Sequence, residues 1–151
     1  MIEYQVIELQ YSCNSACPRT VGVAMTAADR PPDVVEQFRL AESLVSERRP
    51  LEALRELAPV LDVEPDAPSV QLLAGRAYLQ SAQLNRAEAA FLRVLEHNPS
   101  DHYARFALGR TLQRQSRLEE ARAQLAMAVA MNPTPEYQEA LNEVRMRIAS
   151  R

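Results

Sequence analysis

Residues 72–91 read LLAGRAYLQSAQLNRAEAAF, and residues 106–125, which lie 34 positions later, read FALGRTLQRQSRLEEARAQL. The two stretches carry small and bulky apolar residues at matching positions, and a third copy lies one period earlier. Repetition at a fixed period of about 20 to 50 residues indicates stacked structural units. Five columns carry this register between Asp33 and Pro135: Ala41, Gly75 and Gly109; Leu44, Tyr78 and Leu112; Ala53, Ala87 and Ala121; Leu57, Phe91 and Leu125; and Pro65, Pro99 and Pro133.

Each unit is predicted to hold two helices, because apolar residues recur at helical spacing and a proline ends each unit. The predicted helices cover residues 33–47, 50–64, 67–81, 84–98, 101–115 and 118–131, and a last helix runs from Glu136 to Ala149. Four helix starts carry N-cap or capping-box patterns: Asp33, Asn85 with Glu88, Asp101, and Ser116 with Glu119.

Gly75 and Gly109 lie in the middle of predicted helices, where Gly costs about 1 kcal/mol relative to Ala. That cost is tolerated where a neighbouring helix passes so close that a Cβ atom would clash. Ala41 fits the same role with one methyl group, and Tyr78 and Phe91 fill the space beside the crossings. We interpret these columns as packing positions.

The helix predicted at the end of the array differs from the repeat units. Its Gly slot holds Glu143, so a further unit is not expected to pack closely there. One face is apolar and the other is charged, which suits a helix that closes a repeat array, because terminal units must offer a polar face to water. The apolar face holds Tyr137, Ala140, Leu141, Val144 and Ile148, and the charged face holds Glu136, Glu139, Glu143, Arg145 and Arg147.

Residues 1–32 form a leader with no helical pattern. Its Ile2–Tyr11 stretch gives a weak strand signal, and a linker-like segment ends at Pro32. We expect this leader to be disordered or weakly structured, and Met25 is an alternative start of the protein. Cys13 and Cys17 do not have the C-x-x-C spacing of a redox pair, and no further ligands lie near them, so thiol chemistry and a metal site are disfavoured.

The composition excludes several classes of function. Hydrophobic residues make up 47% and charged residues 25%, as in a globular protein, and the net charge of −3 gives no electrostatic reason to expect nucleic acid. No apolar run is long enough to span a bilayer. No catalytic motif, cofactor motif or metal-ligand set is recognisable, and His97 and His102 flank a turn between units, so we predict no enzyme, no cofactor and no metal. All 17 basic residues are Arg, a bias we attribute to a GC-rich bacterial genome, and we expect a cytoplasmic location.

The repeat resembles the tetratricopeptide repeat (TPR) family, whose units are helix–turn–helix pairs. The second unit matches best, with Gly75, Tyr78, Ala87, Phe91 and Pro99 at family-preferred positions. The resemblance implies an all-α, right-handed α-solenoid of units 34–67, 68–101 and 102–135 with a capping helix at 136–150, so that residues 33–151 form one TPR domain. The chain departs from the family pattern at two slots, which hold Ala41 instead of Gly, and Gln37, Gln71 and Arg105 instead of Trp.

In this family the first helices of successive units line a concave groove that holds an extended or helical peptide. The resemblance therefore implies groove residues in each unit: Phe38, Glu42, Leu72, Arg76, Leu79, Tyr103, Phe106, Arg110 and Arg114, together with Val35, Val45 and Gln113. The family's carboxylate clamp, which grips acidic chaperone C-termini, is absent, because its slots hold Phe38, Glu42, Leu73, Tyr103 and Ala107.

The sequence is thus read as a protein–protein interaction scaffold that binds a peptide or helix segment of a partner in this groove. The expected partner is amphipathic, with apolar side chains at the first two units and Asp or Glu near the third. Docking on the convex face is left open. A structural alternative is weak self-association, because residues 34–67 carry a net charge of −4 and residues 102–135 a net charge of +3.

Overall fold

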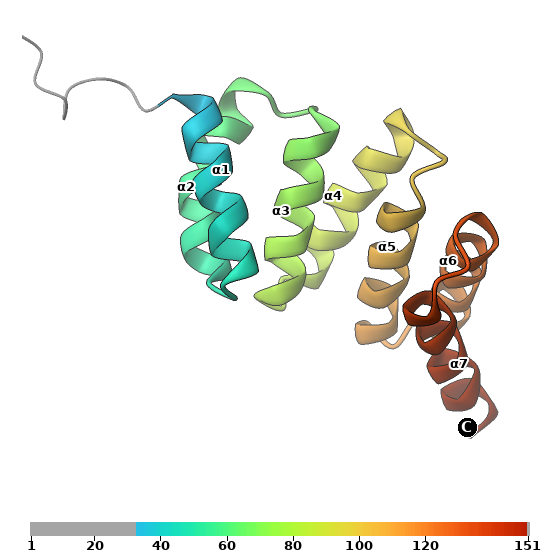
Figure 1. Ribbon diagram of the computed structural model, residues 1–151. Coiled ribbons are helices and arrows are strands. Elements are labelled where there is room, and N and C mark those ends of the chain that lie inside the picture. Colours follow the sequence, from blue (N-terminus) through green and yellow to red (C-terminus); the bar gives the residue numbers. More distant parts are fainter. Residues whose placement is uncertain (1–32, 151) are drawn as a thin grey trace, which may run out of the picture. The chain divides into compact units, whose positions relative to one another are not determined.

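The computed structural model describes residues 33–150, and within that range every regular element is an α-helix (Figure 1). The predicted all-α repeat solenoid is confirmed, and the observed helices agree with the predicted ones to within one or two residues at either end. The leader and its two cysteines lie outside the described residues. The seven helices are α1 (Val34–Ser46), α2 (Pro50–Val63), α3 (Pro68–Gln80), α4 (Leu84–His97), α5 (His102–Arg114), α6 (Leu118–Met131) and α7 (Pro135–Ala149).

Short polar side chains begin three of the helices. The Asp33 carboxylate accepts a hydrogen bond from the backbone N–H of Val35, and the Asp101 carboxylate accepts one from Ala104 at 2.8 Å. These two bonds confirm the predicted N-caps, which satisfy N–H groups that a helix start leaves without partners. Thr134 caps α7 in the same way.

The capping boxes predicted at Asn85 and Ser116 are wrong. Asn85 lies inside α4, and Ser116 lies before the N-cap residue Arg117 with a φ of 64°. The turn between the two helices of a unit uses a left-handed residue instead, at the same slot in every unit: Arg48, Ala82 and Ser116. None of the three is Gly, although this conformation strains any residue that has a Cβ atom.

The helices form three pairs, α1 with α2, α3 with α4, and α5 with α6, and the pairs stack in chain order (Figure 1). We call α1, α3 and α5 the A helices and α2, α4 and α6 the B helices. Helix α3 contacts α4 and both helices of the first pair, and α5 likewise contacts α6 and both helices of the second pair. Helix α7 packs against α5 and α6, so it takes the place of a fourth A helix.

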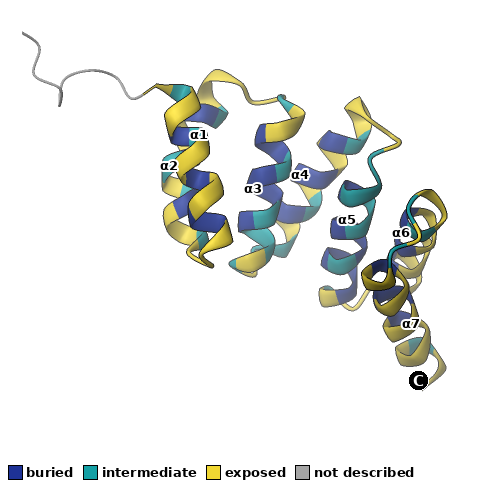
Figure 2. Ribbon diagram, in the orientation of Figure 1, coloured by how far each residue is buried: buried dark blue, intermediate teal, exposed yellow. Residues whose placement is uncertain are grey.

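The glycine columns lie at the crossings within each pair, as predicted. A Cβ atom at Gly75 would come within 2.6 Å of the Phe91 ring, and one at Gly109 would come equally close to Leu125. The buried residues face the inside of the stack (Figure 2). They form two clusters, one from α1 to α3 and one from α4 to α7, and Tyr78 packs against both.

The outer side of α1 is exposed and mostly polar, whereas the same side of later A helices is buried. Val70, Leu73 and their neighbours in α3 are buried against the preceding unit. The corresponding slots of the first unit hold Glu36, Arg39, Leu40 and Ser43, which are all exposed. Apart from Leu40, helix α1 therefore presents the polar outer face that a terminal unit needs.

Candidate functional site

The A helices carry a row of half-buried apolar side chains. Phe38, Leu72 and Phe106 occupy one slot in successive units, and each packs on the core while remaining partly exposed. Leu79 and Tyr103 are half-buried in the same manner. We call the surface that these residues form with Glu42, Arg76, Arg110 and Arg114 the A-helix face. The structure thus places all the predicted groove residues of the three units on successive A helices.

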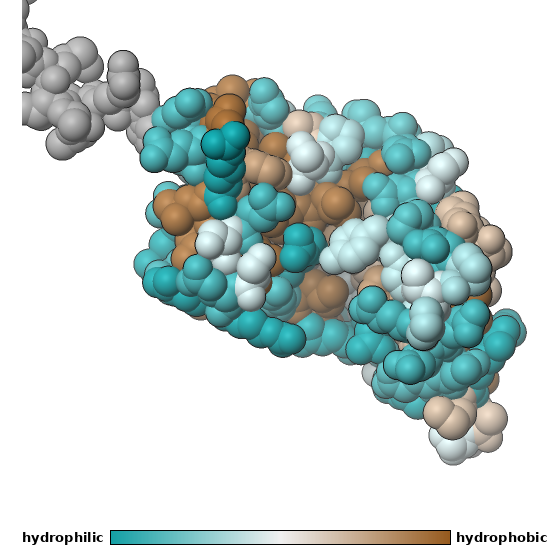
Figure 3. All heavy atoms as spheres, viewed as in Figure 1, coloured by the Kyte–Doolittle hydropathy of each residue, from teal (hydrophilic) through white to brown (hydrophobic). Residues whose placement is uncertain are grey.

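The A-helix face changes in character along the stack. Apolar side chains gather over α1 and α3, whereas the surface over α5 and α7 is mostly hydrophilic (Figure 3). Val35, at the start of α1, is 54% exposed and extends the apolar part. Two residues assigned to the groove from the sequence do not belong to it, because Val45 is 1% exposed and Gln113 is 4% exposed.

Arg76 lies in the middle of this face and is half-buried. Among the residues that the structure describes, it forms no ion pair and no side-chain hydrogen bond. Burial raises the pKa of the neighbouring Tyr103, and the positive charge of Arg76 opposes that rise. A half-buried guanidinium with unused donors is suited to a carboxylate.

The other two predicted arginines are already engaged. The Arg110 guanidinium donates to the Glu143 carboxylate of α7 at 2.8 Å and to the side-chain oxygen of Gln113 at 2.9 Å. Arg114 donates to the backbone carbonyl of Leu79 in the preceding unit. The sequence did not reveal the contacts with Glu143 and Leu79, because they connect residues 33 to 35 positions apart.

A pocket of about 490 Å³ opens between α5 and α7. Helix α5 contributes Phe106 and Arg110, two of the predicted groove residues. The other walls come from the helix that the sequence indicated only as a cap, through Glu136, Glu139, Ala140, Asn142, Glu143 and Met146. We call this cavity the α5–α7 pocket.

Aromatic contacts fix the position of α7 beside this pocket. The Tyr137 ring stacks on Phe106 with the centroids 4.3 Å apart, and its hydroxyl lies 3.1 Å from Nδ1 of His102. Burial and the nearby Glu136 carboxylate raise the pKa of Tyr137. Hydrogen bonding by Gln113 and by Arg110 lowers the pKa of Glu143.

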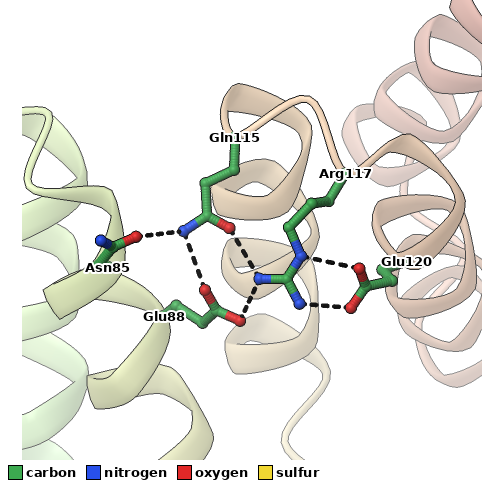
Figure 4. A network of polar contacts seen from close by, with 5 residues as sticks. All are labelled: Asn85, Glu88, Gln115, Arg117 and Glu120. Atoms are coloured by element: carbon green, nitrogen blue, oxygen red, sulfur yellow. Dashed lines mark hydrogen bonds and ion pairs between the residues drawn. The ribbon is translucent and has the colours of Figure 1, made fainter.

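The junction between the second and third pairs is held by a polar network (Figure 4). Arg117, at the start of α6, contacts Glu88 of α4 at 2.7 Å and also pairs with Glu120. The Gln115 amide donates to Glu88 and to Asn85. Hydrogen bonds with Glu120 and Glu88 raise the pKa of Arg117, while Arg117 lowers that of Glu120. These bonds tie consecutive units together.

Gln71 and Arg105, which stand at the position where the family has Trp, form hydrogen bonds to the preceding loop. The Gln71 amide donates to the carbonyl of Pro65, and the Arg105 guanidinium donates to the carbonyl of Pro99 at 2.7 Å. A polar side chain therefore connects α3 and α5 to the proline that ends the previous unit.

Helix pairs that stack in chain order, with a repeat of 34 residues, define an α-helical repeat protein. The chain matches the sequence model of the tetratricopeptide repeat over residues 38–84 and 72–136, which is more than half of its length. It therefore belongs to the tetratricopeptide repeat family. A search of curated proteins gave no sequence match.

Solved structures with the same fold share little sequence with this chain. The first TPR domain of Spaghetti (RPAP3), bound to the HSP90 peptide SRMEEVD, is similar with a TM-score of 0.71 and 18% identity over 77% of this chain and 93% of that chain. MamA from Desulfovibrio magneticus RS-1 is similar with a TM-score of 0.73 and 20% identity over 78% of this chain and 67% of that chain. Among the described helices, none is long and apolar enough to cross a membrane.

Proposed function

We propose that this domain is a protein–protein interaction scaffold whose A-helix face binds a peptide or helix segment of a partner protein. The observation that carries the proposal is the row Phe38, Leu72 and Phe106, which remains partly exposed along three successive helices beside Arg76. Contiguous apolar surface with a polar rim is typical of such sites.

The fold relatives support this class of function. The TPR domain of Spaghetti was solved with a peptide bound, and its helix pairs resemble those of this chain. The peptide bound here should differ, because Leu73 and Ala107, at two of the clamp slots, are buried apolar residues. An acidic-apolar segment fits better, with apolar side chains over α1 and α3 and a carboxylate at Arg76.

The test is to select binders from a displayed library of random peptides and to measure their affinity for variants. Arg76→Ala should weaken binding by about 1 to 3 kcal/mol, since a charge-assisted hydrogen bond is lost. Arg39→Ala is the matched control, because Arg39 is exposed on the outer side of α1. Equal affinity in both variants would move the binding site to the B helices.

A further inference from the structure

We propose that the α5–α7 pocket receives a basic side chain, arginine or lysine, of the bound partner segment. This inference deepens the proposed function and rests on it, because it assigns the chemistry of one end of the A-helix face. It also differs from the expectation drawn from the sequence, in which the third unit faces acidic residues of the partner.

The charges that line the pocket favour a cation. Three carboxylates, those of Glu136, Glu139 and Glu143, face one guanidinium, that of Arg110. Arg110 is paired with Glu143 at 2.8 Å, so its charge is compensated within the protein. Glu136 and Glu139 are exposed and form no ion pair with any residue of the described range.

The apolar walls of the pocket suit a long, flexible cationic side chain. Phe106, Ala140 and Met146 lie among the carboxylates, and Met146 is 66% exposed. Lysine and arginine side chains pack their methylene stems on such surfaces and keep the charged group at a polar edge. The partly exposed Phe106 ring also offers a cation–π contact. The volume of about 490 Å³ is ample for one side chain.

The two charged positions together orient the partner. Arg76 on α3 selects a carboxylate, whereas Glu136 and Glu139 on α7 select a cation. A segment that crosses the A helices therefore places its acidic residue at the second unit and its basic residue beyond the third. The reversed segment sets like charges against each other at both positions, which disfavours it.

The experiment is an NMR titration of the protein with N-acetyl-arginine amide at low ionic strength. Its neutral analogue, N-acetyl-citrulline amide, has nearly the same shape and serves as the reference probe. We expect shifts concentrated at the backbone amides of Phe106, Glu139 and Ala140. The citrulline probe should bind about ten-fold more weakly, because it lacks the charge that strengthens hydrogen bonds to carboxylates.

Variants show whether the arginine probe binds in the pocket or to surface charge in general. The double substitution Glu136→Gln and Glu139→Gln should weaken arginine-probe binding by about ten-fold, whereas Glu96→Gln, at an exposed site on α4, should not change it. Equal binding of the two probes, or unchanged binding in the double variant, would overturn the inference.

The two proposals fail in different ways. If selected peptides depend on Arg76 but the arginine probe does not bind, the inference about the pocket falls and the scaffold stands. If the probe binds at the pocket but no selected peptide contacts the A-helix face, the scaffold proposal falls.

Discussion

The side-chain amide of Gln80 donates a hydrogen bond to the backbone carbonyl of Val45 at 3.1 Å, across the junction of the first and second units. One period later, the Arg114 guanidinium makes the equivalent bond to the carbonyl of Leu79. The last residue of an A helix thus caps a carbonyl near the end of the preceding A helix. The same bond in both junctions shows that stacking is fixed by polar groups as well as by the core.

Gln80→Ala should lower the free energy of unfolding by about 0.5 to 1.5 kcal/mol, because the bond is lost and the Val45 carbonyl is left without this donor. Urea denaturation followed by circular dichroism measures the change. Glu96→Ala is a control at an exposed helical site. A loss no larger than in the control would show that the bond does not contribute to stacking.

Ala82→Gly should stabilise the domain by about 1 kcal/mol, because Ala82 has a φ of 61° and Gly adopts this conformation without strain. Ala89→Gly should have the opposite sign and cost about 1 kcal/mol, since Ala89 is an exposed residue inside α4. Thermal unfolding of the two variants compares them directly. A destabilised Ala82→Gly protein would contradict the left-handed turn.

Gly75→Ala should destabilise the domain by about 1 to 3 kcal/mol, because the added methyl group meets the Phe91 ring. In a Phe91→Ala background the ring is gone, and the same substitution should become neutral or stabilising through the higher helix propensity of Ala. Denaturant unfolding of the four proteins forms a double-mutant cycle. Equal costs in both backgrounds would place the clash elsewhere.

Stability should fall in acid through Glu143. Its folded-state pKa lies below the ordinary value of 4.5, so it contributes stability above that pH and loses the contribution as the pH falls through the folded pKa. The contribution is at most about 1 kcal/mol, because the carboxylate is half exposed. The difference in unfolding free energy between the natural chain and Glu143→Gln should therefore shrink as the solution is acidified. A constant difference would exclude the pair with Arg110 as its source.

Self-association through charged array ends remains a prediction from the sequence, and the structure gives an argument against it. Two of the five arginines that make the third unit positive pair with carboxylates outside that unit, Arg110 with Glu143 and Arg117 with Glu88, so part of the charge is compensated within residues 33–150. We therefore expect a monomer by sedimentation at both low and high salt. A dimer that dissociates as salt is added would restore the self-associating alternative.

The helices and their crossings could be predicted from the sequence because they depend on local spacing and on column identity. A Gly in the middle of a predicted helix, such as Gly75, indicates a close helix crossing even before the neighbouring residue is known. The residues that begin α6 could not be predicted in the same way. The Ser-x-x-Glu pattern at Ser116 suggested a capping box, whereas the structure pairs Arg117 with Glu120 one position later. The matching pair Arg49 and Glu52 in the first unit was the signal that could have revealed it.

The residues of the A-helix face could also be assigned from the register. Which of their arginines are already paired with a carboxylate could not. Whether a guanidinium is available depends on what lies beside it after folding. Arg76 and Arg110 share a slot, yet only Arg110 has a carboxylate of α7 within reach. The pocket was missed for the same reason, because a helix described only as a cap supplies six of its eight lining residues.

Because the core is divided into two clusters, which the Tyr78 side chain joins, the chain can open in parts. In a stack held by nearest-neighbour contacts, α1 and α2 can fray while the cluster from α4 to α7 stays closed, so the amide hydrogens of the first pair exchange with solvent sooner. A segment bound across α1, α3 and α5 holds both clusters shut at once. Occupancy of the face would then appear as slower exchange at α1, far from the charged positions that orient the ligand.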